Sequence, residues 1–198
     1  MALIGITGGP ATGKSRVVES LADCGAAVAD SDQIVHELYS RSQRLRDSVQ
    51  NRWGTTVFTD RGDVDRRRVA EIVFRSAPDR EWLNAQIHPL VWERLVDLER
   101  RRSPIPVYCA IPLLFEVGWQ DRVDGSVGVW CPEPVQRTRL GERGWSAERI
   151  RLCIEAQIPA DDKLERADYG IINSGSTQSL HDQCKAVKDR IEEGLPKT

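Results

Sequence analysis

The stretch GITGGPATGKSR, Gly5–Arg16, decides the fold of this chain. Within it, Gly8–Ser15 fits the pattern G-x-x-x-x-G-K-[ST], preceded by an apolar run and followed by an amphipathic one. In a strand, loop and helix of this kind, the loop N–H groups and the positive end of the helix dipole bind phosphate oxygens. The alternative, a glycine-rich turn with a chance lysine, is disfavoured by this context. The sequence therefore predicts a loop that holds the phosphates of a nucleoside triphosphate.

The residues of this loop have distinct expected roles. The candidate ATP-binding residues are Gly9, Pro10, Ala11, Thr12, Gly13, Lys14 and Ser15. Lys14 is expected to reach the β- and γ-phosphates, and the Ser15 hydroxyl to ligate Mg²⁺. Gly13 allows the backbone a conformation that a side chain would obstruct. A nucleoside triphosphate bound together with Mg²⁺ is therefore the expected ligand.

Short apolar runs separated by helical patterns indicate buried parallel strands. These runs are Ala2–Thr7, Ala26–Asp30, Pro106–Pro112, Gly125–Trp130 and Tyr169–Asn173. The helix after the phosphate loop is expected to stop at Gly25. Alternation of strands and helices predicts an α/β fold of the P-loop NTPase type, with a parallel five-stranded sheet flanked by helices.

Two helical insertions interrupt the alternation. Residues 33–103 read as helices only, and Pro89 is expected to kink or break the last of them. Residues 133–157 predict a helix, a turn at Gly144 and a helix opened by Ser146. The expected organisation is a core of residues 1–32, 104–132 and 158–198, with helical insertions over 33–103 and 133–157.

The composition of the chain limits the binding partners and the cellular compartment that we expect for it. It has 198 residues and a formal net charge of −2, so no basic field favours nucleic acid. Five widely spaced cysteines without a C-x-x-C pair argue against disulfides and zinc. No apolar run suits a membrane helix or a signal peptide. We expect a cytoplasmic protein with free thiols that acts on small molecules, with no membrane, nucleic acid or obligate protein partner.

Three classes of nucleotide-binding protein differ in what happens to the γ-phosphate. They are a small-molecule kinase, a switch GTPase or ATPase, and a nucleotide-binding module without chemistry. The chain lacks N-K-x-D for guanine, and the run at Val107–Ile111 ends in Pro112 rather than in an aspartate. Asp30 and Asp32 instead follow the second strand, at the edge where ligands bind a parallel sheet. A carboxylate there can accept the proton of an acceptor hydroxyl. The pair can equally cap the helix that begins near Gln33, and both roles are compatible.

The chain resembles the dephospho-CoA kinase family over nearly its whole length. The motifs that carry the resemblance are GITGGPATGKS, VADSDQIVHEL, the Leu-Asn-x-x-x-His-Pro signature at Leu83–Pro89, IPLLFE, QRTRLGERG and ADYGIINSGS. The loop alone is shared by many families, whereas the ordered set is much more specific. The resemblance implies transfer of the ATP γ-phosphate to the 3′-hydroxyl of the dephospho-CoA ribose, which is the last step of coenzyme A synthesis.

The resemblance also implies that the insertion over residues 33–103 binds CoA, that residues 133–157 form a lid, and that residues outside the loop have specific roles. Asp32 is the candidate base, supported by Asp30, and Arg139 and Arg143 are candidates for stabilising the transferring phosphoryl group. A solvated helix face is the alternative for the two arginines. Further candidates are His88, at the acceptor site or fixing a kinked helix; Glu116, binding the acceptor or fixing the lid; and Asn173, near the ATP adenine. Trp53, Phe58, Phe74 and Trp82 are expected to pack in the core rather than line a groove for pantetheine.

Two positions, one in the loop and one directly after it, depart from the family pattern. Ala11 stands where the family usually has a glycine, and Arg16 replaces a common threonine. A positive φ at Ala11 would carry a strain of about 1 kcal/mol. This departure affects the expected strength of ATP binding rather than its location.

Overall fold

The computed structural model describes residues 2–194 and divides the chain into two compact units. Unit 1 is Met1–Asp30 with Leu98–Thr198, and unit 2 is Ser31–Asp97. Met1 and residues 195–198, which the sequence analysis assigned to the core, lie outside the described residues. Helix α5 (Ala77–Arg102) continues across the boundary along the chain, and each unit is described by itself below.

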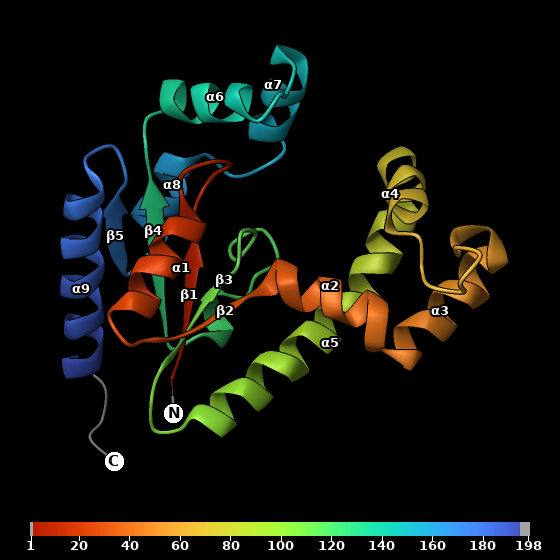
Figure 1. The fold of residues 1–198 in the computed structure, drawn as a ribbon, viewed down its shortest axis with the longest axis horizontal. Coiled ribbons are helices and arrows are strands. Elements are labelled where there is room, and N and C mark those ends of the chain that lie inside the picture. The colour runs from red at the N-terminus through yellow and green to blue at the C-terminus, as the bar shows by residue number, and fades with distance from the viewer. Residues whose placement is uncertain (1, 195–198) are drawn as a thin grey trace. The chain divides into compact units, whose positions relative to one another are not determined.

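Unit 1 is built on a parallel sheet whose strand order is β2-β3-β1-β4-β5 (Figure 1). The strands are β1 (Leu3–Thr7), β2 (Ala27–Asp30), β3 (Val107–Ala110), β4 (Gly125–Trp130) and β5 (Tyr169–Ile172). The expected five-stranded parallel sheet is confirmed, and each strand lies within the apolar run that predicted it. Strand β1 is buried at all five positions, which agrees with its place at the centre of the sheet.

Helices cover both faces of this sheet. Helices α1 (Lys14–Asp23) and α9 (Thr177–Gly194) place Val17, Leu21 and Leu180 in one core cluster with Val127 and Val129 of β4. Gly128 lies between these two valines in the sequence. A Cβ on Gly128 would lie 3.0 Å from Leu164 Cα in helix α8 (Ala160–Arg166). Because successive residues of a strand face opposite sides, α8 covers the other face. Figure 1 shows α1 and α9 with the sheet.

Two helices follow β4, as expected for the proposed lid segment. Helix α6 spans Glu133–Glu142, Gly144 forms the turn with φ 79°, and α7 spans Ala147–Glu155. The Ser146 hydroxyl accepts a hydrogen bond from the Arg149 N–H at 3.3 Å, so the predicted helix start is confirmed. Helix α8 and the short helix η2 (Gln120–Arg122) were not predicted.

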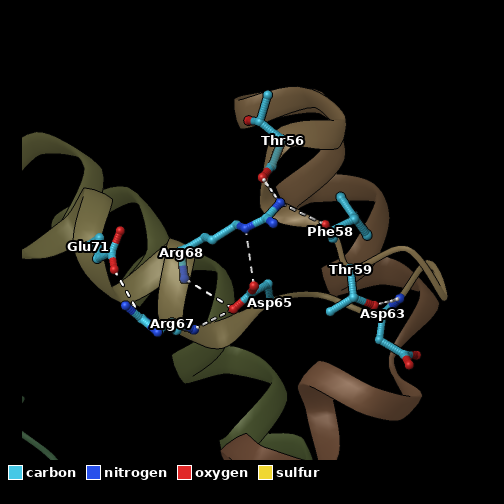
Figure 2. A network of polar contacts seen from close by, with 8 residues as sticks. All are labelled: Thr56, Phe58, Thr59, Asp63, Asp65, Arg67, Arg68 and Glu71. Carbon is cyan, nitrogen blue, oxygen red and sulfur yellow. Dashed lines mark hydrogen bonds and ion pairs between the residues drawn. The ribbon is translucent and has the colours of Figure 1, made fainter.

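Unit 2 consists almost entirely of helices. They are α2 (Ser31–Arg41), α3 (Gln43–Trp53), η1 (Gly54–Val57), α4 (Arg66–Arg75) and α5. Asp65 caps α4 by accepting from the N–H groups of Arg67 and Arg68, at 3.0 and 3.3 Å. The Arg68 side chain then donates to the carbonyl oxygens of Thr56 and Phe58 (Figure 2). This network fixes the irregular segment after η1 to the start of α4.

Pro89 was expected to kink or break its helix, and the break does not occur. Helix α5 continues through Pro89, although proline removes one helical hydrogen bond. Its buried residues are Leu83, Ile87, Leu90, Val91 and Leu95. Their spacing forms one apolar stripe on both sides of the proline, and burial of this stripe outweighs the lost hydrogen bond.

Three observations concern absences. All five cysteines are free, as expected. Within residues 2–194, no group of three or more metal-ligating side chains gathers in one place. No helix in that range combines the length and the apolar character needed to cross a bilayer.

Candidate active site

The phosphate loop joins the end of β1 to the start of α1, as the motif predicts. Gly8 and Gly13 have φ values of 152° and 102°. A Cβ on Gly8 would lie 2.3 Å from the Val129 carbonyl oxygen, and one on Gly13 would lie 1.9 Å from Asn173 Nδ2. Both positions therefore require glycine, for space as well as for backbone conformation.

Ala11 is the only non-glycine residue with a positive φ in the described part of the chain, at 54°. Its neighbour Thr12 is fully buried, and the Thr12 hydroxyl donates to the Gly9 carbonyl oxygen at 3.0 Å. The loop thus holds Ala11 in a left-handed conformation that costs an alanine about 1 kcal/mol. Ala11 therefore has the positive φ that was the condition for strain at this position.

This strain predicts that Ala11→Gly stabilises the protein. Relief of the left-handed strain outweighs the added freedom of the unfolded chain, so the free energy of unfolding should rise by about 0.5 kcal/mol. Chemical denaturation measures it. Ala70→Gly, in the exposed middle of α4, is the matched control and should lower stability by about 1 kcal/mol. Equal destabilisation by both changes would contradict the assignment of strain.

The Lys14 side chain folds over the mouth of the loop. Its Nζ donates to the carbonyl oxygens of Gly8 at 2.8 Å and Gly9 at 2.9 Å. An ammonium held there stands beside the loop N–H groups that a phosphate would contact. Ser15, in the first turn of α1, has an exposed side chain.

Arg139 and Asn173 support the loop from behind. Arg139 Nη1 donates to the carbonyl oxygens of Ala11 at 3.1 Å and Thr12 at 3.3 Å, while its Nη2 donates to the Asn173 carbonyl oxygen at 3.0 Å. Buried Asn173 donates through Nδ2 to the Thr12 carbonyl oxygen at 2.7 Å. The structure therefore brings both predicted residues to the loop, where their contacts are with its carbonyl groups.

A buried thiol lies beside this support. Cys131 Sγ is 3.6 Å from Arg139 Nη1. Burial raises the pKa of the Cys131 thiol, and the nearby charges of Arg139 and Lys14 oppose that rise. The thiol thus stays neutral near pH 7 and does not neutralise the positive charge beside the loop.

The remaining candidates of unit 1 lie in different environments. Asp30 is the last residue of β2, at the carboxyl edge of the sheet that also carries the phosphate loop. Arg143 is exposed and is the first residue after α6, so it does not share the contacts of Arg139. Glu116 is held by Lys163 and by the Ile158 N–H, at 2.7 and 3.1 Å. These contacts favour the second alternative for Glu116, which is to fix the lid.

The two candidates of unit 2 are Asp32 and His88. Asp32 is exposed in the first turn of α2, where a negatively charged carboxylate also interacts favourably with the positive end of the helix dipole. His88 is half-buried in α5, next to Pro89. Burial lowers the pKa of His88 below its ordinary value of 6.5, so its imidazole is neutral at pH 7.

This shift predicts a component of acid sensitivity. The unfolded chain binds the proton of His88 at a higher pH than the folded chain, so stability falls as pH drops below 6.5 through the lower folded pKa. We expect His88→Gln to lose less unfolding free energy than the parent protein between pH 7.5 and 5.5, as measured by urea denaturation. Carboxylates contribute equally to both proteins, so parallel losses would contradict the prediction.

Lys163, which is 0% exposed in α8, was not among the predicted site residues. A lysine between exposed acidic residues, in a segment where no helix was expected, gave no signal of burial. Its contacts with Glu116 became visible only in the folded chain.

Comparison with known proteins identifies the family. The family model described as dephospho-CoA kinase matches residues 2–179. A dephospho-CoA kinase from Synechococcus sp. (strain JA-2-3B'a(2-13)) is 35% identical, and the alignment covers 93% of this chain and 91% of that protein. One from Symbiobacterium thermophilum is 38% identical, with 94% and 80% covered.

Solved structures agree in fold. The crystal structure of TT1252 from Thermus thermophilus has a TM-score of 0.83 and 30% identity, with 98% of both chains covered. A dephospho-CoA kinase from Campylobacter jejuni has a TM-score of 0.69 at 22% identity, covering 97% of this chain and 98% of that one, and shows the fold alone. The P-loop kinase fold and the resemblance inferred from the motifs are both confirmed, and the chain belongs to the dephospho-CoA kinase family.

Proposed function

We propose that this protein transfers the γ-phosphate of ATP to the 3′-hydroxyl of the dephospho-CoA ribose, giving coenzyme A and ADP. The observation that carries the proposal is the phosphate loop, with Lys14 over its mouth and Arg139 and Asn173 behind it, in a chain of this family. Family membership supplies the acceptor, and the loop supplies the donor site.

In this proposal, residues Gly9–Ser15 hold the donor. The backbone N–H groups of the loop and the start of α1 bind the β- and γ-phosphates, and Lys14 neutralises the charge that moves between them. The Ser15 hydroxyl supplies an oxygen ligand of the kind that suits Mg²⁺. Mg²⁺ would neutralise phosphate charge when bound together with ATP.

The acceptor residues are proposed on their chemistry. Asp32 accepts the proton of the ribose hydroxyl and Asp30 supports the site, while neutral His88 binds the acceptor by hydrogen bonding. Arg139 steadies the loop in the described state and stabilises transferring charge together with Arg143 when the lid closes. Of the two roles expected for Glu116, binding the acceptor and fixing the lid, we propose the second.

The same proposal assigns the parts of the chain. Helices within residues 33–103 bind dephospho-CoA, and residues 133–157 form the lid that excludes water. The remaining residues form the core. We propose that the enzyme works in the cytoplasm on its small-molecule substrates, without nucleic acid or an obligate protein partner.

The test is ADP release from ATP and Mg²⁺ by the purified protein, with and without dephospho-CoA, alongside adenosine, AMP and cytidine. Strong stimulation by dephospho-CoA alone is expected. Stimulation by a nucleoside or nucleotide instead would replace the acceptor and keep the kinase. Bound ATP without stimulation by any acceptor would favour a nucleotide-binding regulator.

A further inference from the structure

A fully buried ammonium group lies at the base of the proposed lid. Lys163 is 0% exposed, and its Nζ donates to the Pro112 carbonyl oxygen at 2.7 Å, to Glu116 Oε1 at 2.7 Å and to Gln157 Oε1 at 3.3 Å. These acceptors match the three protons of an ammonium group. Burial lowers the pKa of Lys163, and the contact with Glu116 opposes that fall.

The acceptors of Lys163 belong to separate parts of unit 1. Pro112 follows β3, and its carbonyl oxygen also accepts from the Thr7 hydroxyl at 3.2 Å. Thr7 is the last residue of β1, immediately before the phosphate loop. One carbonyl oxygen therefore joins the entry of the loop to the Lys163 ammonium.

The other side of the cluster holds the chain as it leaves α7. Gln157 and Ile158 lie between α7 and α8, where the proposed lid returns to the core. Glu116 Oε1 accepts from the Ile158 N–H at 3.1 Å while it pairs with Lys163. Lys163 thus reaches the returning segment twice, directly through Gln157 and indirectly through Glu116.

Stability alone explains this cluster poorly. A buried ion pair contributes little net stability, because desolvation offsets the attraction between its charges. Glu116 Oε2 is moreover buried without a hydrogen-bond partner among the described residues, which adds a further desolvation cost. The cluster does, however, define the position of one chain segment against another.

We propose that Lys163 is a positioning residue for phosphoryl transfer, which sets the returning end of the lid against the entry of the phosphate loop. This inference rests on the proposed function. A lid with a loose base closes incompletely, admits water and misplaces the transferring group. The effect of losing Lys163 should therefore appear as uncoupling, in which ADP forms without coenzyme A.

The experiment compares Lys163→Met with the parent protein by coenzyme A formed per ADP released, kcat and KM for ATP. We expect kcat to fall by about 10–100-fold and the ratio to fall below one half of the parent value. Lys185→Met, on the exposed side of α9, controls for loss of a positive charge and should change neither quantity.

If Lys163→Met alone does not fold, a double variant of Glu116→Gln and Lys163→Met takes its place. The double variant removes both buried charges, so no unpaired charge is left to destabilise the fold. A positioning role predicts a low ratio in the double variant as well. A folded variant with the parent ratio and KM would overturn the inference while leaving the proposed function intact. A parent protein that releases no ADP in response to dephospho-CoA would overturn both.

Discussion

Replacing Lys14 with alanine is expected to lower kcat by at least about 10³-fold, to near background. The Lys14 ammonium lies 2.8 and 2.9 Å from the carbonyl oxygens of Gly8 and Gly9, at the mouth of the loop. Alanine leaves no cation at this place, so the charge that develops between the β- and γ-phosphates is no longer balanced. A coupled assay of ADP formation with saturating dephospho-CoA measures the loss.

Two further variants test whether the loss of activity is specific to the Lys14 ammonium group. Lys14→Arg keeps the charge but changes its shape and reach, and should recover only part of the activity. Arg16→Ala removes an exposed cation from the same turn of α1 and should have little effect. A Lys14→Ala protein that is folded by circular dichroism and works within tenfold of the parent rate would refute the assigned role.

Asp32→Asn is expected to lower kcat by about 10²–10⁴-fold with little change in ATP affinity. The amide keeps the size of the carboxylate and can still cap the start of α2, but it cannot accept a proton. The change therefore separates the catalytic role from the capping role. Single-turnover rates with dephospho-CoA measure the first, and titration of ATP binding measures the second.

Asp30→Asn is the matched control, because Asp30 stands at the end of β2 and is proposed only to support the site. Its loss of kcat should be smaller than that of Asp32→Asn. Normal turnover by Asp32→Asn would show that the base is another group. A fall in stability without a fall in kcat would show that the charge of Asp32 stabilises the start of α2 instead.

The sheet and the phosphate loop were predictable because their signals are local. Buried parallel strands leave continuous apolar runs, and a phosphate loop needs glycine at positions such as Gly13, where any side chain would meet Asn173. The helix start at Ser146 followed from equally local chemistry, whereas the positive φ of Ala11 was stated only as a condition. Membership of the family was inferred from several such segments in order.

What the sequence did not reveal depends on contacts between distant segments. Pro89 lies within a continuous helix because the stripe around it is buried, and Phe74, expected in the core, is 83% exposed on α4. The burial of Lys163 depends on Glu116, which lies far away in the sequence. Single-residue patterns carry no information about such partners, so these features needed coordinates.

The support behind the phosphate loop has a consequence for how the parts of unit 1 communicate. The Thr12 carbonyl oxygen accepts from both Arg139 and Asn173, and the same peptide group carries the Gly13 N–H. Donors at one end of a peptide group polarise it and strengthen its N–H as a donor at the other end. By thermodynamic reciprocity, an anion bound to that N–H must tighten the grip of Arg139, and so of helix α6, by the same free energy. Anion binding in the loop is thereby coupled to the position of α6 through a single peptide group.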